Sequence, residues 1–349
     1  MTADRGHRPV EIPGAPPIPG LVVRHLESES DFPALAELIS TVNVHDGVDW
    51  LPTAQVLRHD WEHTDGADLA EDVVVAEVHG AMVGYAEHSW RVRGERVFHH
   101  LHEAVLPDLR RRGLGRALLA WAEARVASGL AARALGAALG LPHVLAGYAD
   151  LEIPAVEPWA TAAGYTADGY GVLMTRPLAD PIPGMQLPAG LELRPVRQEN
   201  HRRIWDADTE AFQDHRDPWA RTESDFESWF SRPNLDTGLW LVAWDGDEVA
   251  GSVMNFVWPE ENAQLGLSRG WLEHVSVRRP WRKRGLATAL IAGSLRLLKD
   301  LDLKEAALGA DAENLTGAVH LYEALGFRRV RTAASYRKPI DVSAGAGRS

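Results

Sequence analysis

The stretch Arg282-Lys283-Arg284-Gly285-Leu286-Ala287 carries the strongest local signal in this chain. It follows a strand-like run, residues 273–277, and opens a helix-like run, residues 288–299. The first backbone N–H groups of a helix lack partners within the helix, and the helix dipole favours negative charge there. Glycine lets the backbone approach such a charge closely. A strand, an Arg/Gly loop and a helix in this order therefore predict a phosphate-binding loop.

A second Arg/Gly loop lies upstream, in the stretch Arg110-Arg111-Arg112-Gly113-Leu114-Gly115. It also stands between a strand-like run, residues 100–105, and a helix-like run, residues 116–125. Gly285 lies 172 positions after Gly113 (285 minus 113). A period of this length indicates a duplicated domain and not a solenoid repeat.

Other elements repeat in the same order in both halves. Each half has a hairpin signal between apolar runs, at His79-Gly80 and at Asp245-Gly246. The order of strand, helix, hairpin, long strand, loop, helix, strand, helix and strand predicts an α/β fold in each half, with a mixed, mostly antiparallel twisted sheet flanked by helices. We expect a flexible Pro/Gly-rich leader, a first domain, a linker, a second domain and a tail, at residues 1–20, 21–178, 179–190, 191–340 and 341–349.

Composition narrows the function. A length of 349 residues suits two domains. The formal net charge of -13 argues against nucleic-acid binding. No run of apolar residues is long enough to span a membrane, and the N-terminus lacks an apolar signal core, so a cytoplasmic protein is expected. The chain has no cysteine, which excludes thiolate metal sites and a cysteine nucleophile, and no metal is expected.

The spacing of particular residues resembles the GCN5-related N-acetyltransferase (GNAT) superfamily, present twice. The acyl-CoA signature of that family matches at Arg282, Gly285 and Ala287, and again at Arg110, Gly113 and Gly115. A second signature, from Asn314 through Leu321-Tyr322-Glu323 to Gly326-Phe327, occurs in the second half alone. The two-domain layout is similar to mycothiol synthase and related actinobacterial tandem acetyltransferases. The resemblance implies two tandem GNAT domains and an N-acetyltransferase that uses acetyl-CoA.

The resemblance also implies which residues hold acetyl-CoA. The backbone amides near Val275 and Val277 would hold the pantetheine arm and the thioester oxygen, because this strand splays from its neighbour in the family. Asn314 is a possible CoA contact and is interpreted first as the N-cap of the next helix. The remaining expected cofactor-binding residues of the second half are Arg282, Lys283, Arg284, Gly285, Leu286, Ala287 and Thr288. Arg110, Arg112, Gly113 and Gly115 form a second candidate set in the first half.

Two catalytic residues are expected in the second half. Tyr322 would protonate the departing thiolate, since a phenol keeps its proton at neutral pH; the alternative is a core tyrosine. Glu273 would accept the proton of the attacking amine; the alternatives are a surface carboxylate or an anchor for the ammonium group. Strand alternation predicts Glu273, Val275 and Val277 on one face and His274, a weaker candidate base, on the other. The first half has Ala160 where the second has Tyr322, so we expect it to be catalytically weak or silent.

The acceptor is expected to be a primary amine of a small molecule, which attacks the thioester directly in a ternary complex. Two alternatives stay open: a non-catalytic CoA-binding, sensing or scaffold protein, and a protein or peptide N-acetyltransferase. The oligomeric state is not predicted. Aromatic side chains between residues 211 and 238 are interpreted as the buried face of a helix, residues 224–230. The polar and aromatic residues of this segment that remain candidates for substrate contact are Asp214, His215, Asp217, Trp219, Glu223, Asp225, Glu227 and Trp229.

Overall fold

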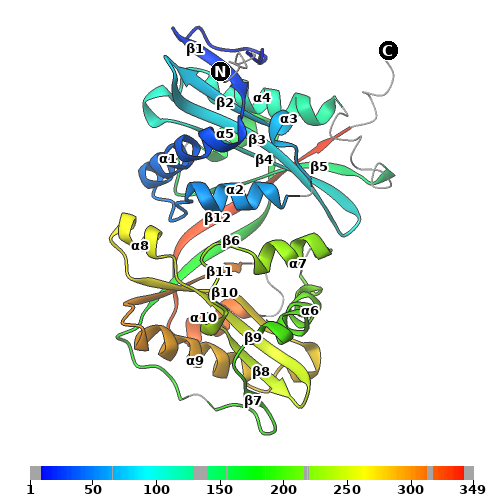
Figure 1. The fold of residues 1–349 in the computed structure, drawn as a ribbon, viewed down its shortest axis with the longest axis vertical. Coiled ribbons are helices and arrows are strands. Elements are labelled where there is room, and N and C mark those ends of the chain that lie inside the picture. The colour runs from blue at the N-terminus through cyan, green and yellow to red at the C-terminus, as the bar shows by residue number, and fades with distance from the viewer. Residues whose placement is uncertain are drawn as a thin grey trace, which may run out of the picture. The chain divides into compact units, whose positions relative to one another are not determined.

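The computed structural model describes residues 9–64, 66–128, 140–154, 156–184, 186–215, 218, 220–312 and 317–341 (Figure 1). The chain divides into two compact units. The first contains Met1–Tyr148, Ala160–Thr166 and Tyr336–Ser349, and the second contains Ala149–Trp159 and Ala167–Ser335. Within the described ranges, no helix is both long and apolar enough to cross a membrane.

The sheet of the first unit has the strand order β1-β2-β3-β4-β5. Neighbouring strands pair antiparallel, except that β4 and β5 pair parallel. The strands are β1 Leu21–His25, β2 Val73–Val78, β3 Ala81–Arg93, β4 Arg96–Val105 and β5 His143–Asp150. The helices of this part of the chain are α1 Ser28–Asp46, α2 Ala54–Glu62, α3 Leu69–Asp72, the 3-10 turn Pro107–Leu109, α4 Leu114–Ala127 and α5 Val156–Ala162.

Local sequence explains several of these elements. The predicted hairpin between β2 and β3 is confirmed, with His79 and Gly80 both at positive φ (52° and 83°), as a tight two-residue turn requires. The leader differs from the flexible segment expected. Val10 N–H donates to Val23 O at 2.7 Å, and Ile12 is buried. The described part of the leader is therefore held at its start, where Pro9 and Val10 pair with β1.

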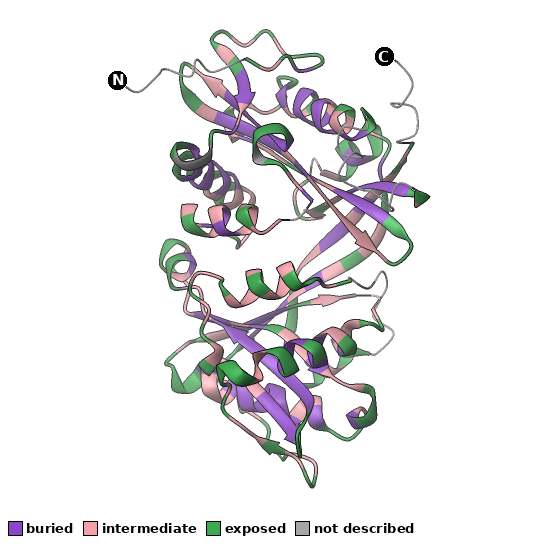
Figure 2. Ribbon diagram, turned by 45° about the vertical axis from the view of Figure 1, so that its right-hand side comes forward, coloured by how far each residue is buried: buried purple, intermediate pink, exposed green. Residues whose placement is uncertain are grey.

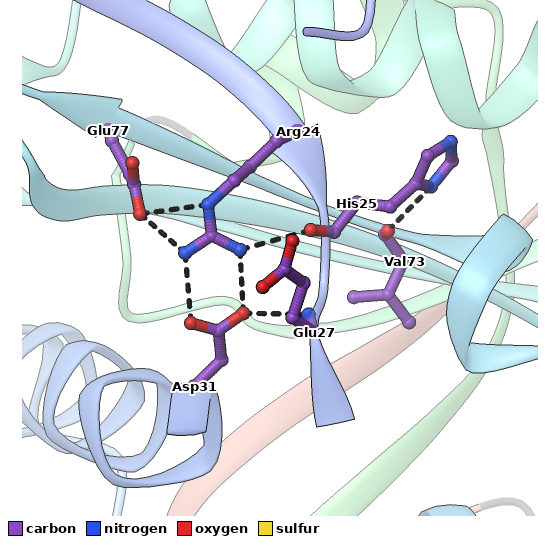
Figure 3. Close-up of polar contacts among 6 residues, drawn as sticks. All are labelled: Arg24, His25, Glu27, Asp31, Val73 and Glu77. Carbon is purple, nitrogen blue, oxygen red and sulfur yellow. Dashed lines mark hydrogen bonds and ion pairs between the residues drawn. The ribbon is translucent and has the colours of Figure 1, made fainter. Parts of the chain in front are cut away.

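A buried ion-pair cluster joins β1, β2 and α1 (Figure 3). The Arg24 guanidinium donates to both Asp31 oxygens, at 2.6 and 2.9 Å, and its Nε donates to Glu77 at 3.1 Å. The hydrogen bond to Asp31, with that to Glu77 and the charges of both carboxylates, raises the pKa of Arg24 against the opposing effect of burial. Pairing compensates the burial of Arg24 and Asp31 and the partial burial of Glu77, and it fixes α1 against the edge of the sheet.

A row of buried histidines crosses β3, β4 and β5. His88 Nε2 lies 3.0 Å from His99 Nδ1, and His99 Nε2 lies 2.8 Å from His143 Nδ1. Burial, together with the neighbouring histidines, lowers the pKa of His99 to about 3. The ring is therefore neutral at pH 7, and its hydrogen bonds tie the centre of the sheet together.

The strand order in the second unit is β12-β6-β11-β10-β9-β8-β7, and β12 belongs to this unit only as far as Ser335. The β10–β11 pair is parallel, and the β9–β10, β8–β9, β7–β8 and β6–β11 pairs are antiparallel. The strands are β6 Thr166–Pro177, β7 Glu192–Leu193, β8 Leu241–Asp245, β9 Glu248–Phe256, β10 Arg269–Val277, β11 Glu305–Asp311 and β12 Arg328–Ile340. The helices are α6 His201–Phe212, α7 Glu223–Phe230, α8 Pro259–Leu265, α9 Leu286–Asp300 and α10 Ala318–Ala324, with 3-10 turns at Gln198–Asn200, Thr237–Leu239 and Arg279–Trp281.

Two hydrophobic clusters cover the two faces of this second sheet. Leu272 and Val253 pack with α9 on one face, and Met254 and Phe256 pack with Ile204 of α6 on the other. Figure 2 shows buried residues along the strands of both units. The mixed sheet flanked by helices agrees with the predicted fold class.

Strand β6 packs in the second unit, although it precedes the proline-rich stretch of residues 179–190. It pairs with β11 from Gly171↔Asp311 to Pro177↔Glu305. The buried Arg176 of β6 donates to Leu325 O at 2.7 Å and to Pro181 O at 2.7 Å. The packing unit thus begins before the repeat boundary expected near residue 178, because hydrogen bonds across the sheet hold β6. The repeat boundaries themselves stay a prediction.

Candidate functional site

The Arg/Gly loop of the second unit joins β10 to α9. Arg282 Nε donates to Val277 O at 2.8 Å, its Nη2 donates to Ala211 O at 3.1 Å, and its Nη1 pairs with Asp214. Gly285 forms the N-cap of α9 at φ 84°. The Arg282 side chain, expected to bind cofactor, therefore braces the loop against β10 and α6 in this structure.

The start of α9 offers unpaired donors. The first helical hydrogen bond runs from Ala289 N–H to Gly285 O at 3.0 Å. Among the described residues, none accepts from the N–H groups of Leu286, Ala287 or Thr288. A Cβ atom added to Gly285 would meet no atom within 4 Å, so the space beside this glycine is open. This arrangement fits a phosphate group.

Two cations flank the same amides. Lys283, at φ 58°, and Arg284 are exposed, and no described residue pairs with either side chain. Unpaired cations beside a helix N-terminus add charge that attracts a phosphate.

Strands β10 and β11 separate after a short paired region. They pair only from Arg269↔Glu305 to Trp271↔Ala307 within the described residues. From Leu272 onward this edge of β10 has no paired strand, and Val275 and Val277 lie along it, partly buried against the α9 cluster. The splay implied by the family resemblance is therefore present. It leaves backbone groups available to a ligand beside the phosphate loop.

Glu273 occupies a β-bulge. Leu272 pairs with Asn255 and His274 pairs with Met254, so Glu273 is an extra residue in β10. A bulge interrupts the period-2 alternation at this residue, so the face of the Glu273 side chain stays a prediction. Val275 and Val277 lie on the α9 face and His274 on the α6 face, as the alternation predicted. Glu273 is exposed, yet desolvation raises the pKa of its carboxyl group against the partial opposing effect of His274 and Arg232.

His274 lies on the α6 side of β10 and has a buried partner. Its Nδ1 lies 2.9 Å from Asp208 Oδ2, and Arg221 Nη1 donates to the same oxygen at 2.8 Å. Burial alone would raise the pKa of Asp208, but His274 and Arg221 outweigh it and hold that pKa below its usual value. Asp208 and Arg221 were not predicted from the sequence. The available signal was an acid within the buried stripe of α6, between Ile204 and Ala211.

Tyr322 lies on α10 and is buried within the α9 cluster. Its ring contacts Phe327 edge to face, and burial raises the pKa of the phenol to about 12. No described residue hydrogen-bonds to its hydroxyl group.

The start of α10 differs from the prediction. Asn314 lies outside the described residues, and the N-cap of α10 is Gly317 at φ 75°, which corrects the expectation that Asn314 caps this helix. Gly326 has the predicted positive φ, at 90°.

Most acids between residues 211 and 238 have structural partners. Asp214 pairs with Arg279 and Arg282, and Glu223 pairs with Arg202. Asp225 completes the capping box of α7 with Thr222. The predicted helix is confirmed, and its partly buried Trp229 and Phe230 pack in the α6 cluster. Glu227 is exposed, His215 packs on Phe212, and Trp229 also contacts His274; Asp217 and Trp219 lie outside the described residues.

The first unit repeats the loop, and its β4 likewise pairs with β5 only from Val97↔His143 to His100↔Ala146 within the described residues, but it lacks the bulge. Arg110 Nε donates to Val105 O at 3.0 Å, its Nη groups pair with Asp46, and Arg112 and Gly113 are exposed. Gly113, at φ 97°, caps α4, and Gly115 lies in its first turn. Strand β4 pairs with β3 without a bulge from Val105 to Arg96. In addition, a side chain on Gly113 would meet Pro16 at 3.6 Å.

This combination of a mixed sheet, a splayed strand pair and a helix N-terminus behind an Arg/Gly loop defines an acyl-CoA-binding fold. Residues 201–327 match the model described as "Acetyltransferase (GNAT) family", and residues 70–149 match a second, "Acetyltransferase (GNAT) domain". The chain belongs to the GNAT family. It is therefore an N-acetyltransferase, and acetyl-CoA is its acyl donor.

Similar proteins extend over most of the chain. The mycothiol acetyltransferase of Thermobispora bispora is 31% identical over 73% of this chain and 78% of its own length. That of Geodermatophilus obscurus is 29% identical over 87% of this chain and 93% of its own length. A crystal structure of a GCN5-related N-acetyltransferase from Sphaerobacter thermophilus matches with a TM-score of 0.68 and 26% identity, covering 94% of this chain and 97% of the other. A tandem GNAT protein from the clavulanic acid biosynthesis pathway shares the fold, with a TM-score of 0.62, 17% identity, and coverage of 91% of this chain and 98% of the other.

Proposed function

We propose that the chain transfers an acetyl group from acetyl-CoA to the primary amine of a small molecule, and that the second unit carries out the chemistry. The observation that carries this proposal is the bulge at Glu273 beside the splayed edge of β10, together with Tyr322 on α10. The first unit has an unbroken β4 and Ala160 instead.

The loop and α9 would hold acetyl-CoA by its phosphates. Lys283 and Arg284 supply charge, Gly285 leaves open space, and the amides of Leu286 to Thr288 supply donors. Arg282 contributes by fixing the loop rather than by reaching outward. When bound, acetyl-CoA supplies the acetyl group as a thioester. Asn314 stays a predicted contact. Arg110, Arg112, Gly113 and Gly115 would form a second, non-catalytic site in the first unit.

Glu273 and Tyr322 take the proton-transfer roles. Glu273 accepts a proton from the incoming ammonium group, because an alkylammonium has no lone pair with which to attack. Desolvation raises the pKa of Glu273, which makes its carboxylate a stronger base. Tyr322 donates a proton to the leaving sulfur. Backbone N–H groups near Val275 and Val277 stabilise the developing oxyanion. Attack is direct, since the chain has no cysteine to carry the acetyl group.

The acceptor is proposed from the relatives. They are named mycothiol acetyltransferases, so the unacetylated form of mycothiol is the first amine to test. A lysine-containing peptide represents the alternative of protein acetylation. Binding of CoA without any acetyl transfer represents the alternative of a sensing or scaffold protein. A cytoplasmic location also stays a prediction.

The test is product formation followed by mass spectrometry, with acetyl-CoA and either amine. We expect an acetylated small-molecule product and no acetylated peptide. The double variant Tyr322→Phe, Glu273→Gln should reduce the rate at least a hundredfold, in line with the contribution of proton transfer to such reactions. Full activity in the double variant would refute the residue assignment. Binding of acetyl-CoA without product across a wide range of amines would favour the scaffold alternative.

A further inference from the structure

The proton balance of the proposed reaction needs a second acceptor. An alkylammonium carries three N–H bonds, and the amide product of a primary amine carries one. Two protons therefore leave the nitrogen, and the proposed function assigns only one of them, to Glu273. The residue that follows Glu273 in β10 has the chemistry to accept the other.

His274 is held in one orientation by groups that are themselves buried. The side chain of Asp208 is fully buried. Its Oδ2 atom lies 2.9 Å from His274 Nδ1 and accepts a hydrogen bond from Arg221 Nη1 at 2.8 Å. The Arg221 guanidinium stacks over the rings of Trp205 and Phe212, and the rings of Phe212 and Trp229 lie against His274 at centroid distances of 5.3 and 4.9 Å. The imidazole thus has little freedom to turn.

The same contacts determine its tautomer. An ionised carboxylate only accepts hydrogen bonds, so Nδ1 carries the hydrogen when the imidazole is neutral. Nε2 is then the atom with a free lone pair. No described residue hydrogen-bonds to Nε2, and 21% of the His274 side chain is exposed. A base held by an acid on its far nitrogen is the arrangement that orients histidine for proton transfer in many enzymes.

His274 also lies next to the bulge in β10. Glu273 and His274 are consecutive, and together they follow Leu272, where β10 separates from β11. Tyr322 belongs to the α9 cluster, whereas His274 lies on the α6 side of the sheet. His274 and Tyr322 therefore lie toward opposite faces of the sheet, next to the strand edge that separates from β11.

We propose that His274, oriented by the positioning residues Asp208 and Arg221, accepts the second proton of the amine; this rests on the proposed function. Glu273 takes the first proton, which leaves the electron pair on nitrogen for attack on the acetyl carbonyl. As the carbon–nitrogen bond forms and the carbon–sulfur bond breaks, the second N–H bond breaks and its proton binds Nε2 of His274. Tyr322 gives one proton to sulfur. Exchange with water then releases two protons and returns one, so the reaction yields one proton overall.

The test compares His274→Ala and Asp208→Asn with a matched control. His102 is the counterpart of His274 in the first unit, 172 positions earlier, and its Nδ1 lies 2.8 Å from Glu87. With acetyl-CoA and unacetylated mycothiol, His274→Ala should lower kcat about a hundredfold with little change in the KM for acetyl-CoA. Added imidazole should raise the kcat of His274→Ala at least tenfold, because it fits the space left by the missing ring. Asp208→Asn should lower kcat about tenfold without rescue, and His102→Ala should change neither constant.

A second readout does not depend on turnover. In the ligand-free protein, nitrogen NMR of labelled histidine should show His274 with its hydrogen on Nδ1, and Asp208→Asn should lose that preference. A hydrogen on Nε2 in the wild-type protein would overturn the proposal. So would a kcat of His274→Ala within twofold of wild type, or a loss in a folded variant that imidazole does not restore. If the wild-type protein forms no product, the proposed acceptor fails instead, while the NMR result still decides the orientation of His274.

Discussion

Arg110 in the first unit and Arg282 in the second make the same contact, from Nε to the last carbonyl of the preceding strand, at 3.0 and 2.8 Å. Both loops also place a non-glycine residue, Arg111 or Lys283, and then a glycine at positive φ. Two halves that differ widely in sequence have therefore kept one backbone. These constraints belong to the strand–loop–helix connection, and they persist whether or not chemistry takes place there.

The surroundings of the two loops differ. The second unit has a bulge at Glu273 and a tyrosine on the following helix, while the first has an unbroken strand, Ala160, and Pro16 close to its loop glycine. The fold of this family is therefore separable from its chemistry, since both units keep the strand–loop–helix backbone while only the second has the bulge and the tyrosine.

The largest expected effect comes from the tyrosine that only the second unit has at this position. Tyr322→Phe should lower kcat about 10²- to 10⁴-fold, because the leaving sulfur loses its proton donor. Burial raises the pKa of Tyr322 to about 12, so the phenol keeps its proton and wild-type activity should not decline from this cause below about pH 10. The control is Tyr165→Phe, a buried tyrosine of the first unit that donates to Glu123 at 2.9 Å. An equal loss in both variants would mean that Tyr322 acts through packing.

Much of this comparison follows from sequence. Hairpins, helices and Arg/Gly loops depend on local signals, and the structure has them where they were predicted. The bulge at Glu273 could not be predicted in this way, because one extra residue in a strand changes neither its composition nor its local sequence signals. The partnership of His274 with Asp208 joins residues 66 positions apart, and only packing of α6 on β10 reveals it. The placement of β6 in the second unit likewise depends on long-range pairing with β11.

The next expected effect concerns two arginines at matching places in the repeat, Arg24 in β1 and Arg194 directly after β7. Arg24→Leu leaves the buried Asp31 and the partly buried Glu77 without their partner, and should lower the free energy of unfolding by about 3–5 kcal/mol. Arg194→Leu removes an exposed pair with Glu192 and should cost about 0–1 kcal/mol. Chemical denaturation of both variants measures the difference. Similar losses would show that the buried cluster contributes no more than a surface pair.

A smaller effect should separate the two loop glycines. Gly285→Glu places bulk and negative charge in the open space before α9, and should lower kcat/KM for acetyl-CoA at least tenfold. Gly113→Glu carries the same strain from positive φ but should leave kcat/KM within about twofold. Calorimetric titration with CoA supplies the binding measurement. A second binding event lost only in Gly113→Glu would assign a CoA site to the first unit, and a fall in turnover there would contradict the division of labour.

The smallest expected effect concerns Glu103, the counterpart of Val275 in the first unit. Burial raises the pKa of Glu103 from 4.5 to about 7, with Glu123 adding to the rise and His102 opposing it. A folded-state pKa above the unfolded value means that the stability linked to this group is full below about pH 4.5 and is lost as pH rises through 7. Glu103→Gln removes the titration, so the variant should match wild type near pH 4 and exceed it by about 1–3 kcal/mol at pH 8. Denaturation at both pH values measures this gap. If the difference in the free energy of unfolding between variant and wild type were the same at both pH values, Glu103 would have the same pKa in the folded and unfolded protein. An acid at this position would then not destabilise the first unit at neutral pH.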